Sequence, residues 1–281
     1  MVGALVSFSA MAVSVRVLSV RLHIIEILAI RNFGGLAMLL AFGATRPALF
    51  HAMTRRRAGL HLMRNCCHFA GQYLWAVSLT LLPLATVFAL EFTMPAYAAL
   101  LAVLFLRERM TPSRIGVVIC GFLGVLVILR PGFESFRPAA VMVLIAAFLY
   151  AVALTQTKAL TSTETTFAIL LWMNLIQLPL ALVATDPRAY LTLDTIDAVP
   201  ACAVAVAGLA SHLCLAQAFR AGDATLVVPL DFMRIPLIAV VGWWFYGEAL
   251  DIYVFAGAGL IIAGVLWNLR VEANPKVKIK P

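Results

Sequence analysis

Long uninterrupted apolar runs fill most of this chain, and short segments with charged residues, Pro or Gly separate them. A run of ~20 apolar residues is what an α-helix needs to cross the hydrocarbon core of a bilayer. The strands of a membrane barrel would instead alternate over ~10 residues, and these runs are continuous and longer. The pattern predicts ten transmembrane helices, over residues 2–19, 24–44, 60–82, 84–106, 113–130, 138–157, 166–185, 198–219, 224–246 and 250–269.

The composition supports lipid as the main solvent of this protein. Of the 281 residues, 63% are hydrophobic and 12% are charged, against roughly 45–50% and about 25% in soluble domains. The chain is therefore predicted to be an all-α integral membrane protein that forms one domain over residues 1–281 in a lipid bilayer. The five cysteines show no CxxC spacing, which argues against a disulfide framework or a metal site. The sequence predicts no cofactor and no nucleic-acid partner.

The basic residues give the orientation in the membrane. If the N-terminus is cytoplasmic, 14 of the 21 Lys and Arg residues lie in segments on the inner side and 5 lie on the outer side. Loops on the cytoplasmic side carry an excess of Lys and Arg. We therefore predict a multi-pass protein of the cell inner membrane with both termini cytoplasmic and residues 271–281 as a cytoplasmic tail.

The chain also overlays on itself when it is shifted by 140 residues. Leu90, Phe92, Phe105 and Glu108 then meet Leu230, Phe232, Phe245 and Glu248, and Glu91 meets Asp231. The shift predicts two repeats, over residues 1–132 and 137–270, with five helices each. Because five is odd, the second repeat has to be inverted in the membrane. Inverted repeats are typical of transporters whose halves rock around a central site.

Four charged residues interrupt the apolar runs: Arg31, Glu91, Asp231 and Arg234. A charge at a helix centre costs about 2.5–3.5 kcal/mol on insertion scales, so each should face a cavity or a partner. Asp231 and Arg234 are three apart and can pair on one helix face. Arg31 and Glu91 each lie ~10 Å deep from the outer side, at 1.5 Å per residue, and could also pair. Both structural ion pairs and cavity-lining roles are compatible with this pattern.

Two prolines lie close to these charges, Pro95 after Glu91 and Pro236 after Arg234. A proline inside a helix removes a backbone hydrogen bond and kinks it, so each is a candidate hinge, with a packing kink as the alternative. Polar and aromatic side chains occur at similar depth. The full set of predicted substrate-binding residues is Glu91, Arg31, Asp231, Arg234, Gln72, Trp75, Tyr97 and His212.

Three stretches carry a resemblance to a known family: "LHIIEILAIRNFGG", "EFTMPAYAALLAVLFLRERMTPSRIGVVICGFLGVLVILRPG" and "AQAFRAGDATLVVPLDFMRIPLIAVVGWWFYGE". Along its whole length the chain resembles the EamA family of the drug/metabolite transporter superfamily. The resemblance implies a ten-helix secondary transporter. Similar chains move amino acids, riboflavin, S-adenosylmethionine, other metabolites or drugs, so the resemblance leaves the substrate open.

These observations predict a secondary active transporter of a small metabolite that is amino acid-like, zwitterionic or heteroaromatic. Alternating access would expose the site to each side of the membrane in turn. Transport would be driven by proton coupling through the carboxylates or by exchange of one substrate for another. A channel or sensor is the alternative. An intramembrane enzyme is less favoured, because HExxH and GxSxG are absent and Glu91 and Asp231 are expected at mirrored depths, too far apart to act as a pair. Either a monomer or a homodimer fits the sequence.

Overall fold

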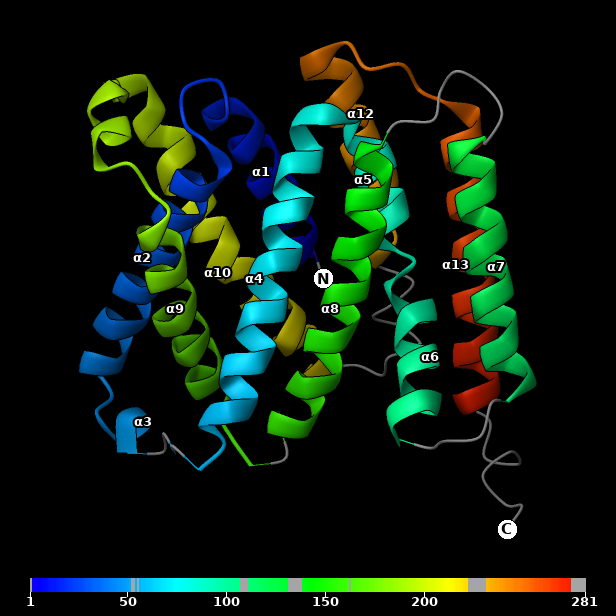
Figure 1. The fold of residues 1–281 in the computed structure, drawn as a ribbon, viewed down its shortest axis with the longest axis horizontal. Helices are drawn as coiled ribbons and strands as arrows, with labels where there is room; N and C mark the ends of the chain where they lie inside the picture. The colour runs from blue at the N-terminus through cyan, green and yellow to red at the C-terminus, as the bar shows by residue number, and fades with distance from the viewer. Residues whose placement is uncertain are drawn as a thin grey trace.

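The computed structural model describes residues 2–51, 54, 56–106, 111–130, 138–161, 163–221 and 231–273. Within these residues all regular structure is helical (Figure 1). In chain order the elements are α1 (Val2–Leu18), α2 (Ile24–Ala44), α3 (Ala48–His51), α4 (Ala58–Leu81), α5 (Leu84–Glu91), α6 (Met94–Leu106), α7 (Pro112–Leu129), α8 (Ala139–Thr161), α9 (Thr166–Val183), the 3-10 turns η1 (Pro187–Thr192) and η2 (Thr195–Asp197), α10 (Ala198–Ala221), α12 (Arg234–Tyr246) and α13 (Ile252–Ala273).

The prediction of an all-helical membrane protein is confirmed. Seven helical stretches of the described chain are long and apolar enough to cross a membrane, and α1 and α12 are shorter apolar helices. The 24-residue α4 is not among the seven, because His61, Arg64, Asn65 and other polar residues interrupt its apolar sequence. The count of ten spans and the orientation of the termini stay predictions.

The predicted helix over residues 84–106 is two helices, which corrects the sequence analysis. α5 ends at Glu91, Phe92 and Thr93 form a turn, and α6 begins at Met94. Pro95 is thus the second residue of α6, where the missing N–H costs nothing, because the first N–H groups of a helix have no intrahelical acceptor. The proline lies four residues after Glu91, so its ring would clash with the Glu91 carbonyl in a continuous helix.

The same break recurs 140 residues later. Asp231 is helical, Phe232 and Met233 form a turn, and α12 begins at Arg234 with Pro236 in its first turn. The first part of this predicted helix, residues 224–230, lies outside the described residues. The 13 residues of α6 and the 13 of α12 coincide under the shift, as do the 24 of α4 and the 24 of α10.

The helices form a bundle with two outer pairs (Figure 1). α2 and α9 stand at one edge, α7 and α13 stand side by side at the other, and α4 and α8 lie between the two edges. Thr111 begins α7 by accepting a hydrogen bond from the Arg114 backbone N–H at 3.4 Å, and Thr165 begins α9 in the same way through Ala168 at 3.2 Å. Such side-chain caps satisfy backbone donors that the first turn leaves free.

Glycines allow α7 and α13 to approach closely. A Cβ atom at Gly124 of α7 would lie 2.7 Å from the carbonyl oxygen of Gly257, and one at Gly257 would lie 2.6 Å from the carbonyl oxygen of Gly124. Small residues at such spacing let helix backbones meet in a membrane. In this structure the small-residue faces of α7 and α13 meet each other.

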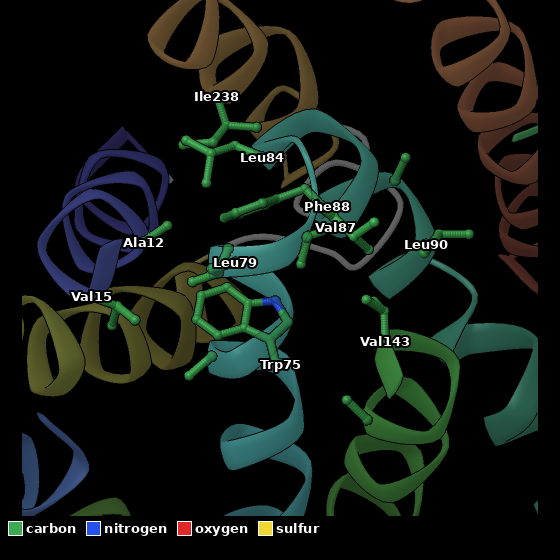
Figure 2. Close-up of a cluster of buried hydrophobic side chains, with 14 of the residues drawn as sticks. Ala12, Val15, Trp75, Leu79, Leu84, Val87, Phe88, Leu90, Val143 and Ile238 are labelled. Atoms are coloured by element: carbon green, nitrogen blue, oxygen red, sulfur yellow. The ribbon is translucent and has the colours of Figure 1, made fainter. Parts of the chain in front are cut away.

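The largest apolar core lies where α1, α4, α5, α8 and α12 converge (Figure 2). Phe88 and Leu84 of α5 are fully buried, and Ile238 of α12 packs in the same cluster. Figure 2 shows Trp75 of α4 beneath Phe88, and the two rings meet edge to face with centroids 5.8 Å apart. This core fixes the short α5, so the position of its last residue, Glu91, depends on packing above it.

The α7–α13 contact gives a first prediction. We expect Gly124→Ala to lower the stability of the purified protein by about 1–3 kcal/mol, because the added methyl group overpacks a backbone contact. Thermal unfolding in detergent measures this change. The matched control is Gly259→Ala in α13, where a Cβ atom meets nothing within 4 Å. Equal unfolding temperatures for the two variants would contradict the helix contact.

Candidate functional site

One face of α4 carries a stripe of buried polar side chains. His61, Arg64, His68, Gln72 and Trp75 are all buried and follow one another at intervals of three or four residues. Residues at that spacing lie on one face of a helix. The stripe extends ~21 Å along the axis at 1.5 Å per residue, and it connects two groups of charged side chains inside the bundle.

The first group, which we name the acidic cluster, contains Glu91, Asp231, Arg234 and Trp75. Arg234 donates from Nη2 to Asp231 Oδ2 at 2.6 Å, and its Nη1 lies 3.6 Å from Glu91 Oε1 as an ion pair beyond hydrogen-bonding distance. Trp75 Nε1 donates to Glu91 Oε2 at 2.8 Å. The Arg234 side chain is 6% exposed, whereas the Glu91 and Asp231 side chains are 14% and 15% exposed. The carboxylates are therefore the more accessible members.

Aromatic rings cover the remaining faces of Arg234. Its guanidinium carbon lies 4.2 Å from the ring centroid of Phe8, 4.9 Å from that of Phe92 and 5.8 Å from that of Phe88. A cation over an aromatic face is attracted by the ring quadrupole, and the attraction grows when water is excluded. The rings and the two carboxylates together make a buried cation tolerable.

Two expectations about this cluster need correction, although the Asp231–Arg234 pair is confirmed. Glu91 does not pair with Arg31, because Arg234 occupies the position beside it. Glu91 and Asp231 are also not separated by their depths, since both contact one guanidinium. The two helix breaks are the reason: each carboxylate ends a helical segment where the chain turns, and the two turns meet, with the Phe92 and Phe232 rings 4.8 Å apart.

The second group, which we name the arginine cluster, contains Arg31, Arg64, His68, Gln72 and His212. Arg31 Nη1 donates to Gln72 Oε1 at 3.1 Å and to Asn32 Oδ1 at 3.3 Å, and its Nη2 lies 3.3 Å from His212 Nε2. Arginine has no acceptor, so His212 accepts through Nε2 and carries its proton on Nδ1. Gln72 and His212 are equivalent positions under the 140-residue shift, and both hold the same arginine.

The sequence analysis missed Arg64 as a member of this group and counted it among the inner-side basic residues. It lies within α4, is 5% exposed, and donates to Thr157 Oγ1 at 3.0 Å and to Asn65 Oδ1 at 2.7 Å. Arg64 precedes His68 by four residues and Gln72 by eight, and this helical spacing is the sequence signal that places it on the same helix face.

Tyr150 of α8 is a second residue that sequence analysis missed. Its ring lies 5.4 Å from the His68 ring, so it packs beside the arginine cluster. The predicted site residue Tyr97 belongs to neither cluster, because it packs edge to face on Phe148 at 5.7 Å.

Polar contacts close the end of the bundle above the acidic cluster. Arg16 of α1 pairs with Glu248, which follows α12, and donates to the carbonyl oxygens of Leu79 at 2.8 Å and Leu82 at 2.6 Å. Glu248 also accepts from the backbone N–H of Leu84 at 2.8 Å. One ion pair thus ties α1, the α4–α5 turn and the end of α12 together.

Comparison with known proteins agrees with this arrangement. The model of the EamA-like transporter family matches residues 1–130 and 137–270. A riboflavin transporter of Brucella anthropi is 31% identical over 253 residues, covering 84% of this chain and 86% of that protein. An S-adenosylmethionine uptake transporter of Rickettsia felis is 27% identical over 271 residues, covering 95% and 90%. A solved protein crystal structure has the same fold, with a TM-score of 0.60, 16% identity and 98% coverage of both chains.

The family match and the named relatives thus point to a multi-pass helical transporter rather than an enzyme. The chain belongs to the EamA-like transporter family. The predicted resemblance is confirmed, and so is the expectation of a transporter.

The acidic cluster predicts a specific energetic coupling. We expect Arg234→Gln to cost about 3–5 kcal/mol in the wild-type protein, because it leaves two neighbouring carboxylates without their cation. The loss should be smaller by about 0.5–3 kcal/mol in a Glu91→Gln background. Unfolding of the single and double variants in detergent measures the coupling.

Arg31→Gln is the matched control for this cycle, since it removes the other central arginine. Its effect should be the same with Glu91 and with Glu91→Gln, because the two side chains do not pair in the structure. Coupling of Glu91 to Arg31 instead of to Arg234 would contradict the observed contacts.

Proposed function

We propose that this chain is a secondary active transporter that carries a small metabolite across the inner membrane by alternating access. The observation that carries the proposal is the position of Arg234 between Glu91 and Asp231, each of which ends a helix at an equivalent break. Interrupted helices at matching positions of two repeats are where secondary transporters place substrate and coupling-ion sites.

The recurrence of helix bounds under a shift of 140 residues supports two repeats, over residues 1–132 and 137–270. The family match falls in two sections with closely similar limits. In this proposal the repeats are inverted, the breaks at Phe92–Thr93 and Phe232–Met233 act as hinges with Pro95 and Pro236, and the halves rock about the acidic cluster. The Arg16–Glu248 contacts then hold one side of the transporter closed.

The charges of the acidic cluster also give a physical reason for transport to be coupled to a proton or to a cationic group of the substrate. Two carboxylates share one guanidinium, so with both ionised the three side chains carry one uncompensated negative charge. A proton or a cationic group of the substrate can balance it, and either would weaken the hold of Arg234 on one carboxylate. Proton coupling or exchange through Glu91 and Asp231 therefore fits the geometry.

The substrate is proposed to be a small amino acid-like, zwitterionic or heteroaromatic metabolite. The buried site offers carboxylates, guanidinium groups and the rings of Phe8, Trp75, Phe88 and Phe92. The similar proteins are named as transporters of riboflavin and S-adenosylmethionine, which are both heteroaromatic. A channel is the less favoured alternative, because a charge-balanced arginine between two helix breaks is expected of an alternating-access site.

Flux through proteoliposomes tests the coupling. We expect Glu91→Gln to fold, because Asp231 still balances Arg234, and to lose stimulation of riboflavin or S-adenosylmethionine uptake by a pH gradient, because glutamine resembles the protonated acid. Exchange with equal pH on both sides should survive. Normal gradient-driven uptake by a well-folded Glu91→Gln protein would remove Glu91 from the coupling mechanism. Tyr97→Phe, outside both clusters, is the control that should retain the stimulation.

Cysteine labelling in cells tests the proposed orientation. In a background without native cysteines, Leu191→Cys in η1 should react with an impermeant maleimide in intact cells, because Leu191 is 85% exposed on the side predicted to face outward. Arg56→Cys, just before α4, should react only after permeabilisation. The reverse pattern would show that the orientation is opposite.

A further inference from the structure

Two buried guanidinium groups lie inside the bundle without a carboxylate partner. Arg31 is 2% exposed and Arg64 is 5% exposed. In the described part of the chain, neither forms an ion pair within 4.0 Å with Asp or Glu. Buried charges in proteins are normally paired or bound to a ligand. Arg234 is paired with carboxylates in this way, whereas Arg31 and Arg64 are not.

The hydrogen-bond partners of the two arginines are all neutral. Arg31 donates to Gln72, Asn32 and His212, and Arg64 donates to Thr157 and Asn65. Amide, hydroxyl and imidazole acceptors satisfy donors but do not balance charge. The arginine cluster therefore retains two positive charges.

Several buried donors beside these arginines have no acceptor. They are Arg31 Nε, Asn32 Nδ2 and Asn65 Nδ2. A buried donor left without a partner costs free energy unless a ligand or water supplies an acceptor. Each of the three flanks an arginine, so the cluster lacks acceptors and negative charge at the same place.

Glu164, the carboxylate that contacts the α4 stripe at His61, does not fill this role. Glu164 Oε2 lies 2.8 Å from His61 Nε2, as a hydrogen bond or an ion pair, and both side chains are fully buried. His61 is one turn before Arg64 on α4, yet Arg64 turns toward Thr157 instead. Glu164 is thus engaged by histidine, and the two arginines remain available to a ligand.

The two arginines also face a common place. Arg31 Nη2 lies 3.3 Å from His212 Nε2, and the His212 ring lies 5.6 Å from the ring of His68, which follows Arg64 by one turn on α4. On α4, Gln72 lies three residues before Trp75. Gln72 accepts a hydrogen bond from Arg31, and Trp75 donates one to Glu91. The arginine cluster thus begins about one helical turn, ~5 Å, from the acidic cluster along the same helix.

We propose that the arginine cluster is the subsite for the anionic group of the transported metabolite, a carboxylate or a phosphate, with Arg31 and Arg64 as its ligands. Guanidinium groups bind both anions through paired N–H donors. The inference rests on the proposed function and makes it more specific: the substrate carries a negative group that lies about one helical turn from the part that meets Glu91. Gln72 and His212 position Arg31 until the anion replaces one of them.

Anion binding can be measured without knowing the metabolite. The purified protein is unfolded thermally while sodium phosphate or sodium acetate replaces sodium chloride at constant ionic strength. We expect at least one of the two anions to raise the unfolding temperature of the wild-type protein saturably, by several degrees, because a ligand that binds only the folded state stabilises it. Phosphate alone would identify a phosphate subsite, and acetate alone a carboxylate subsite.

Arg31→Gln and Arg64→Gln should each abolish this saturable shift. Arg21→Gln is the matched control, since Arg21 is paired with Asp194 and Asp197 at the surface. The ligand-free Gln variants should unfold at the same temperature as wild type or higher, because each removes an uncompensated buried charge. If Arg31→Gln does not fold, Gly208→Ala replaces it, because its Cβ atom would lie 2.6 Å from Arg31 Nε and displace the guanidinium.

The outcomes separate this inference from the proposed function. No saturable shift in wild type, or an equal shift in both Gln variants, overturns the anion subsite. Paired flux assays of S-adenosylmethionine and its carboxyl methyl ester, and of riboflavin 5′-phosphate and riboflavin, then give an independent result. Uptake that ignores the anionic group overturns the subsite alone. A saturable anion shift that Arg31→Gln and Arg64→Gln abolish supports the subsite whether or not any of the four compounds is taken up, so failure of the transport assay is distinguishable from failure of the subsite.

Discussion

A buried charge in a membrane protein is costly unless a partner or a ligand balances it, and the centre of this bundle is arranged around how Arg234 is balanced. Its guanidinium lies between Glu91 and Asp231, with Phe8 and Phe92 against its faces. Glu91 is the last residue of α5, and Asp231 lies just before the turn that leads into α12. The two turns meet, with the Phe92 and Phe232 rings 4.8 Å apart, so the ion pairs form where the helices break.

The same constraint gives α4 its unusual composition. Its buried face carries the polar stripe that holds Glu91 through Trp75 and Arg31 through Gln72, and that includes Arg64. In the bundle α1, α2, α8 and α9 pack against this helix and shield it from lipid. The negative charge of the acidic cluster and the positive charge of the arginine cluster are then separated along one rigid helix.

Packing away from the site is consistent with this division of roles. The glycine contact between α7 and α13 forms one edge of the bundle, whereas the buried charges lie on α2, α4 and α5 and at the start of α12. The Arg16–Glu248 pair joins segments from both predicted repeats at one end.

The sequence by itself determined the apolar lengths, the helical class, the 140-residue repeat and the identity of the charged residues, because all of these depend on composition and local spacing. It also predicted the Asp231–Arg234 pair, which is local to one turn. The tertiary structure alone decided that Arg234, rather than Arg31, meets Glu91 and that Arg64 is buried. It also decided that Tyr150 contacts His68 and that Tyr97 lies outside both clusters. These contacts join helices distant in sequence, and their geometry depends on where a helix breaks and how the helices pack.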